Sequence, residues 1–411
     1  RASAESPVAS PLGFETPTAQ SAALPYKVGA AVVDITPTWR TMLAGFEHRT
    51  KPTVGVYQPI HAKAVTIGDG RKKVVYIIAD ICYWDSCNKP HGIIDSIRTA
   101  LKKQHGLESN QIIMIAAHNH SGPVLGDERF CKLLVKKTIE VVGEAIKNER
   151  PARIFFGRGS CNVGISRRGT DMNGDDTWEI NPYGPRDPEV VVLKAVGADG
   201  KPIAVTFNYG CHPTTIGTDY IGGDYVGYAQ VEMEKRLGGI PALFMQGTAG
   251  DVKPDFHTPA DRFNFIGPKN CTPDVPERFG MTLADEVTKV LAAPMEEIAG
   301  PVRYGHTVVE LPVLSAWTGT NQIETDNKFD PAKPFSGPTR RMARMAKRML
   351  ASMDENGKYK ITQSGEVCVV RIGDKFVNVS LAGEVCSPIG LRIKDQLRGK
   401  NVMVTTYTNT Y

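Results

Sequence analysis

The sequence lacks the signature motifs of several large enzyme classes. No Gly-x-Ser-x-Gly stretch is present, which argues against a serine hydrolase with a nucleophile elbow, and no His-Glu-x-x-His stretch marks a zincin. No Walker loop or dinucleotide-binding glycine motif follows any of the predicted strands. The sequence therefore does not indicate a serine hydrolase, a zincin, or an enzyme that binds nucleotide phosphates or dinucleotides by these motifs.

Long apolar runs and paired cysteines are also missing. No apolar stretch approaches the ~20 residues that span a bilayer. The eight cysteines are scattered without a Cys-x-x-Cys pair, so neither a zinc knuckle nor a thioredoxin-like site is indicated. Lys and Arg total 49 against 44 Asp and Glu, and no basic block is interleaved with aromatics, so nucleic acid is not an expected partner. The densest basic stretch, 340–348, is compatible with peripheral contact to an anionic membrane surface.

The composition changes along the chain and predicts its domain organisation. Residues 1–25 are rich in Ala, Ser, Pro and Thr without periodicity, which predicts a flexible segment of the kind that follows a removed export signal. A secreted or periplasmic protein is therefore expected. Residues 26–411 are predicted to form one catalytic domain. Within it, residues 312–360 are first Pro/Gly/Thr-rich and then Met-rich and charged, which favours an insertion or a lid.

Buried strands alternate with amphipathic helices, which predicts an α/β fold of mixed β-sheets flanked by helices. The predicted strands are 28–35, 61–67, 73–80, 111–117, 203–209, 242–245, 367–372, 376–381 and 402–407, and the predicted helices are 91–104, 225–237 and 388–397. Metal-competent side chains recur just after these strands. Since ligands bind at the carboxyl ends of strands in α/β sheets, a metal site is expected there.

His118 and His120 are the first candidates for that site. They flank one residue at the end of a predicted strand, and in extended geometry they would face the same side, so that one could bind metal while the other hydrogen-bonds nearby. The alternative is a hydrogen-bonded polar corner. His212, Asp80 and Glu384 follow other strands, but each alone could equally be a turn residue or a helix cap.

Five stretches, in order, resemble the motifs of the neutral/alkaline ceramidase family. They are Gly29–Pro37 (GAAVVDITP), Ala116–Pro123 (AAHNHSGP), Tyr209–Thr214 (YGCHPT), Gln246–Pro254 (QGTAGDVKP) and Gly383–Leu391 (GEVCSPIGL). Together they extend over most of residues 27–411. The resemblance identifies this part of the chain as similar to the family's N-terminal catalytic domain.

The resemblance implies a ligand set for a Zn²⁺ cofactor. His118, His212 and Glu384 would be zinc ligands, and Tyr411 would be a fourth unless that ligand lies beyond the given sequence. His120 would lie behind the metal or face the substrate. Arg167, with Arg168 as a close rival, would match the family arginine near the substrate carbonyl, where a guanidinium could stabilise an oxyanion.

The function implied is a zinc-dependent hydrolase that cleaves a ceramide-like N-acyl amide by attack of zinc-bound water. His120 or a carboxylate such as Asp80 would handle the proton. Lys253 stands where the family has a serine of catalytic role, and the family's C-terminal immunoglobulin-like domain does not follow. These departures keep two alternatives open: a hydrolase of another amide or an ester, and a binding protein that kept the scaffold. The oligomeric state is not indicated.

Overall fold

The computed structural model describes residues 24–46, 49–84, 92–170, 172, 176–177, 179–256, 272–312 and 362–409. The chain divides into two units, residues 1–306 with 368–411 and residues 307–367. Most of the predicted flexible segment (1–25) and of the predicted insertion or lid (312–360) lies outside the described residues.

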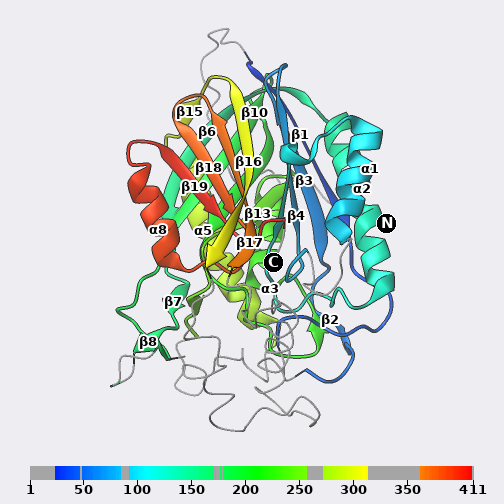
Figure 1. Cartoon of the computed structure of the whole chain (residues 1–411), viewed down its shortest axis with the longest axis vertical. Coiled ribbons are helices and arrows are strands. Elements are labelled where there is room, and N and C mark those ends of the chain that lie inside the picture. The colour runs from blue at the N-terminus through cyan, green and yellow to red at the C-terminus, as the bar shows by residue number, and fades with distance from the viewer. Residues whose placement is uncertain are drawn as a thin grey trace, which may run out of the picture. The chain divides into compact units, whose positions relative to one another are not determined.

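A mixed sheet in the order β13-β11-β10-β6-β1-β3-β4-β5, with β15 added beside β6, forms the centre of the larger unit (Figure 1). Its strands are β1 (Tyr26–Asp34), β3 (His61–Gly68), β4 (Lys73–Ala79), β5 (Ile112–Ala116), β6 (Arg150–Ser160), β10 (Glu189–Gly197), β11 (Pro202–Tyr209), β13 (Ala242–Gln246) and β15 (Glu296–Ile298). The pairs β4–β5 and β11–β13 are parallel, whereas the other neighbours run antiparallel. Within each parallel pair, the carboxyl ends of the two strands therefore lie side by side.

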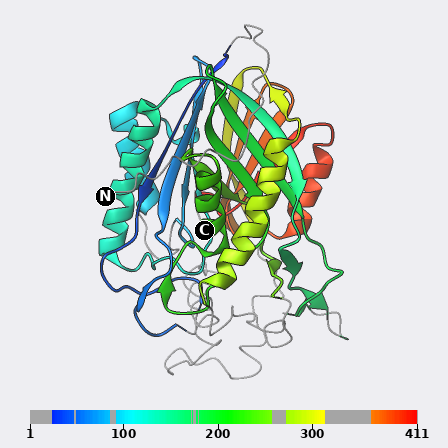
Figure 2. The same cartoon turned by 180° about the vertical axis from the view of Figure 1, so that it is seen from behind.

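Helices cover one face of this sheet. They are α1 (Ile93–His105), α2 (Glu128–Lys147), α3 (Asp224–Arg236) and α5 (Asp274–Ala292). Helices α1 and α2 bury apolar residues at helical spacing, such as Ile97 and Leu101, against β3, β4 and β5. Helices α3 and α5 pack in the same way on β10, β11 and β13, and Figure 2 shows α5 in front of these strands.

The part of a second sheet that belongs to the larger unit packs on the opposite face. Its strands are β16 (Val302–Pro312), β17 (Thr362–Ile372), β18 (Phe376–Leu381) and β19 (Asn401–Thr405), in that order. Val370, Phe376 and Met403 join Tyr76 and Ile113 of the large sheet in one apolar core. Helix α8 (Ser387–Gln396) connects β18 to β19, which pair in parallel. The predicted α/β fold of mixed sheets flanked by helices is confirmed.

Three short strand pairs lie outside the two sheets. They are β2 (Gly55–Val56) with β12 (Tyr220–Ile221), β7 (Gly164–Ser166) with β14 (Val252–Pro254), and β8 (Gly169–Thr170) with β9 (Asp176–Thr177).

The segment after β19 links the two edge strands of the large sheet. The Thr406 N–H donates to the carbonyl of Gln246 in β13 (2.9 Å), and the Asn409 N–H donates to the carbonyl of Met114 in β5 (2.7 Å). Between these points the carbonyl of Tyr407 accepts from the N–H of Ala116 (3.2 Å). Residues 406–409, named here the bridging segment, therefore join both edges near the carboxyl ends of β5 and β13.

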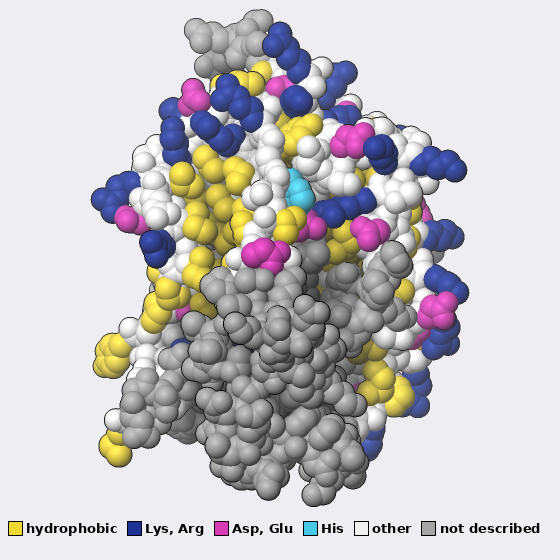
Figure 3. Space-filling model, in the orientation of Figure 1, with side chains coloured by type: hydrophobic (Ala, Val, Ile, Leu, Met, Phe, Trp, Pro, Cys, Tyr) yellow, Lys and Arg dark blue, Asp and Glu magenta, His cyan; other side chains and the backbone are white. Residues whose placement is uncertain are grey.

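The surface of the described part is mixed in charge. Figure 3 shows Lys and Arg side chains interspersed with Asp and Glu, as expected for a net charge of +5. In the described ranges no helix has both the length and the apolar character needed to cross a bilayer.

Candidate metal centre

The ends of three strands deliver side chains to one place. His118 follows β5, His212 follows β11 and Glu384 follows β18. His118 Nε2 lies 3.1 Å from His212 Nε2, and the carboxylate oxygens of Glu384 lie 3.2 Å from His212 Nε2 and 3.9 Å from His118 Nε2. The structure thus brings together the three residues for which the resemblance implied metal binding.

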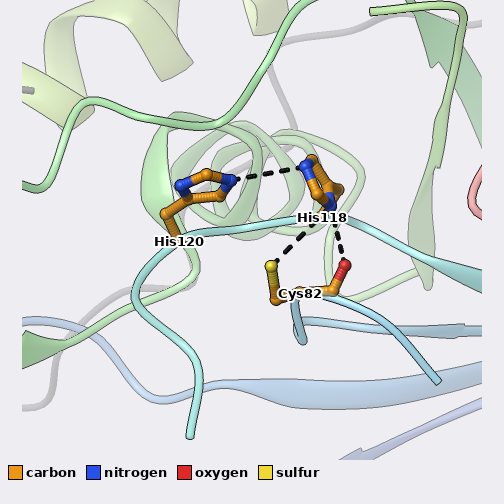
Figure 4. Close-up of side chains that lie close together, drawn as sticks. All are labelled: Cys82, His118 and His120. Carbon is orange, nitrogen blue, oxygen red and sulfur yellow. Dashed lines mark hydrogen bonds between the residues drawn. The ribbon is translucent and has the colours of Figure 1, made fainter. Parts of the chain in front are cut away.

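Hydrogen bonds to the backbone fix which nitrogen of each ring is available. His118 Nδ1 donates to the carbonyl of Cys82 (2.7 Å; Figure 4), and His212 Nδ1 donates to the carbonyl of Ala249. These partners assign the proton of each ring to Nδ1, which leaves both Nε2 atoms as acceptors. Two acceptors 3.1 Å apart cannot hydrogen-bond to each other, so their geometry favours a cation bound to both.

The protonation states also fit a metal. Burial, followed by the neighbouring His212, lowers the pKa of His118 to about 3, and burial lowers the pKa of His212 as well. Burial alone would raise the pKa of Glu384, but polar and charged neighbours, the guanidinium of Arg167 among them, outweigh it and hold that pKa well below its usual range. Neutral imidazoles and an ionised carboxylate, His₂Glu, are a ligand set of hydrolytic zinc sites.

His120 lies beside this group rather than within it. Its Nε2 is 3.3 Å from His118 Nε2, and among the described residues its buried Nδ1 has no hydrogen-bond partner. The ring packs edge-on against Phe46 (centroids 4.8 Å apart) and closely against Gly45. The expected extended geometry at His118 is wrong: its φ is +62°, so the chain turns there. This turn lets its N–H bond to Ile81 and still directs both rings to one place.

Of the two arginine candidates, Arg167 reaches the cluster. Its Nη2 donates to Glu384 Oε1 (3.0 Å) and to the carbonyl of Gly250 (3.0 Å), and lies 3.1 Å from His212 Nε2. The Arg167 side chain is buried, whereas Arg168 is half-buried. This placement favours Arg167 over Arg168 as the cation next to the ligands.

Asp80 has a different setting from the one expected. Its Oδ2 accepts from the His61 N–H (2.8 Å) and its Oδ1 accepts from Gln230 Nε2 (3.0 Å). Both oxygens therefore connect β4 to β3 and α3. Hydrogen bonds of this kind are what a buried carboxylate requires, so they account for Asp80 structurally, and its catalytic role stays a prediction.

Two other expectations concern the lysine in the family's serine position and the fourth ligand. Lys253 is buried on β14, with its Nζ 4.7 Å from the centroid of the Phe256 ring. Tyr411 lies outside the described residues. Tyr407 is nearby instead: its ring stacks on His118, with centroids 3.7 Å apart and planes 15° from parallel. Tyr407 belongs to a predicted strand (402–407), and nothing in the local sequence indicated that its ring reaches His118.

A second group of metal-competent side chains shares His118. Cys82 Sγ lies 3.8 Å from His118 Nδ1, and Cys82, His118 and His120 are close enough to form a ligand group. Burial raises the pKa of the Cys82 thiol well above its usual range, which disfavours the thiolate that binds metal. The group His118–His212–Glu384 is therefore the better metal centre.

Comparisons with known proteins identify similar sequences and folds. Residues 26–326 match the family described as neutral/alkaline non-lysosomal ceramidase, N-terminal. A neutral ceramidase of Pseudomonas aeruginosa is 23% identical over 305 residues, which cover 67% of this chain and 43% of that protein. The chain thus spans less than half the length of this relative.

Two solved structures share the fold. The crystal structure of neutral ceramidase from Pseudomonas aeruginosa superposes with a TM-score of 0.71 at 19% identity, covering 94% of this chain and 68% of that one. A structure described as ceramidase complexed with C2 gives a TM-score of 0.69 at 19% identity, covering 94% of this chain and 69% of that one.

Proposed function

The chain belongs to the neutral/alkaline non-lysosomal ceramidase family, and on that premise we propose that it is a zinc-dependent hydrolase of a ceramide-like N-acyl amide. The observation that carries the proposal is the convergence of His118, His212 and Glu384. Two ring nitrogens without protons and an ionised carboxylate meet there, and they come from three separate strand ends. Such a set matches the preferences of zinc.

When bound, zinc polarises a carbonyl and makes a water molecule more acidic. His118, His212 and Glu384 hold the ion, and the backbone carbonyls of Cys82 and Ala249 keep the two rings oriented.

The remaining charged and polar groups have roles in amide cleavage. Arg167 places a buried guanidinium beside the ligands, where it can stabilise negative charge on the carbonyl oxygen as water adds to the carbon. His120 accepts a proton from the attacking water and returns it to the leaving nitrogen. The carbon–nitrogen bond then breaks to give a carboxylic acid and an amine.

Metal analysis tests this proposal directly. Protein purified without chelator is expected to hold about one equivalent of zinc and to lose it on His118→Ala substitution. Less than about a tenth of an equivalent of zinc, with unchanged stability after His118→Ala, would contradict the metal centre.

The substrate needs a separate test, because Lys253 replaces the family's serine. A buried cation on β14 favours considering another amide or an ester. A long-chain ceramide should be assayed beside short N-acyl amides and esters, with kcat/KM as the measure. If ceramide has the highest kcat/KM, the proposed substrate is supported. If short amides or esters have the highest kcat/KM, they are the substrate class in place of ceramide. A protein that binds zinc but turns over none of them is a binding protein on this scaffold.

Two further predictions concern the cellular setting. We propose a secreted or periplasmic location and peripheral contact with membranes through the basic stretch 340–348, which lies outside the described residues. Cell fractionation tests the location, and co-sedimentation with lipid vesicles tests the membrane contact.

A further inference from the structure

Arg49 is a buried arginine that interacts mainly with backbone carbonyls. Its side chain is 1% exposed, and Nη1 donates to the carbonyls of Ala44 (3.1 Å) and His120. Nη2 donates to the carbonyls of Ile216 (2.8 Å) and Thr218 (2.7 Å). One planar guanidinium thus holds three loops: residues 43–46, the loop after β5 that carries His120, and the loop after His212.

Among the described residues, no close ion pair explains the burial of this cation. The carboxylate of Asp219 is 3.9 Å from Nε, at the limit for an ion pair. Burial lowers the pKa of Arg49 to about 10, so the guanidinium is still charged at neutral pH. Burying a charge is unfavourable unless hydrogen bonds replace its hydration. The carbonyls provide that replacement for the two terminal nitrogens, and their positions set the distances between the loops.

The loop after His212 is held from its other side by Asp224. This buried carboxylate accepts from the N–H groups of Thr215 and Ile216 and from the Thr215 hydroxyl. Residues 215–218 therefore have an anion on their N–H groups and the Arg49 cation on their carbonyls. Ile216 is bound by both, because its N–H donates to Asp224 and its carbonyl accepts from Arg49.

Direct hydrogen bonds also join the two histidine loops. The His120 N–H donates to the carbonyl of Pro213 (3.1 Å), and Ser121 Oγ donates to the carbonyl of Ile216 (3.2 Å). Arg49 binds both sides of this junction, because it contacts His120 on one loop and Ile216 on the other.

We infer that Arg49 is a positioning residue that fixes the loop of His118 and His120 against the loop of His212, and so sets the geometry of the metal centre. This rests on the proposed function for the identity of the metal. Lysine cannot replace it, because an ammonium offers its donors from one atom whereas Arg49 uses two nitrogens about as far apart as the carbonyls require.

The test compares Arg49→Lys with Arg40→Lys. Arg40 also donates to backbone carbonyls, those of Thr53 (2.8 Å) and Pro52 (3.5 Å), but it is exposed. Each protein is loaded with Co²⁺, whose visible absorption reports the coordination geometry, and kcat and KM are measured with zinc. For Arg49→Lys we expect an altered cobalt spectrum and a kcat lower by about 10-fold to 100-fold at nearly unchanged KM. Arg40→Lys should match the unaltered protein in both.

A cobalt spectrum of Arg49→Lys identical to that of the unaltered protein overturns the inference, whatever the change in kcat. If Arg49→Lys does not fold, Ser121→Ala removes one link between the same loops and must alter the spectrum in its place. An unaltered protein that binds cobalt but hydrolyses no amide contradicts only the proposed function. An unaltered protein that binds neither cobalt nor zinc overturns both.

Discussion

Substitution of Gly45 by alanine tests the role of His120 through its packing. Gly45 has φ = +92°, and a Cβ added there would lie 2.3 Å from His120 Cγ and 2.6 Å from His120 Nδ1. Carbon atoms in contact are about 3.5 Å apart, so the imidazole must move by about 1 Å. A displacement of that size in a catalytic group lowers kcat by about 100-fold. We therefore expect Gly45→Ala to lose most of its kcat and to keep its zinc, because His120 is not a proposed ligand.

The matched control is Gly70→Ala in the turn between β3 and β4. Gly70 has nearly the same φ, +86°, but a Cβ there meets no atom within 4 Å. Alanine in this backbone region is destabilising by about 1–2 kcal/mol at either position. Both variants should therefore show a lower Tm, and only Gly45→Ala a lower kcat.

Two outcomes of this comparison would refute the reasoning. If Gly45→Ala retains kcat within about 3-fold of the unaltered protein, the position of His120 does not matter for the reaction. If zinc is lost together with kcat, His120 is a ligand and not the proton carrier. Metal analysis and steady-state kinetics on the same preparations distinguish the two.

Three further predictions follow from other side chains. Glu384→Gln keeps the shape but removes the charge of a ligand, so zinc affinity measured by competition with a chelator should fall at least about 100-fold; an unchanged Kd would contradict the ligand set. Asp80→Asn should lower the free energy of unfolding by about 1–3 kcal/mol and leave zinc content and kcat nearly unchanged, whereas a low kcat at full stability would support its predicted catalytic role. The Asp127 carboxylate caps α2, and although burial raises its pKa, hydrogen bonds lower it from 3.8 to about 2. Its ionised form therefore stabilises the fold above about pH 4, and this stabilisation is lost as the pH falls through 2. Asp127→Asn should lower the free energy of unfolding by about 1 kcal/mol at pH 7. Urea titrations should show that the difference between the two proteins becomes smaller toward pH 2.

Much of the architecture could be predicted from local sequence. The hairpin of β3 and β4 follows from two apolar runs around a glycine turn, and α1 follows from apolar residues at helical spacing. The strand ends β5, β11 and β18 each lie just before a residue of the His118–His212–Glu384 group, while the role of that group as a metal site stays a prediction. Which strand ends meet was indicated only by the family resemblance, since strand order depends on long-range pairing.

The supporting residues around the histidines could not be predicted. Arg49 acts on backbone carbonyls, which every residue has, so its partners leave no trace in the sequence. The positive φ of His118 has no local signal either, because such conformations usually belong to Gly or Asn. The hydrogen bonds of Asp80 could not be predicted either, because a carboxylate at a strand end looks the same in the sequence whether it serves chemistry or holds the fold.

The bridging segment has a consequence for the order of folding. Asn409 of this segment accepts a hydrogen bond from Met114, which lies 295 residues earlier in the sequence. Tyr407 of the same segment stacks on His118. Loop closure over such a distance is slow, and contacts of this kind form late. A nascent chain that has made His118 and His212 still lacks both Glu384 and the ring that backs His118. We therefore expect the site to bind metal only after β18 and β19 have joined the fold. Metal occupancy then indicates that these C-terminal strands have folded.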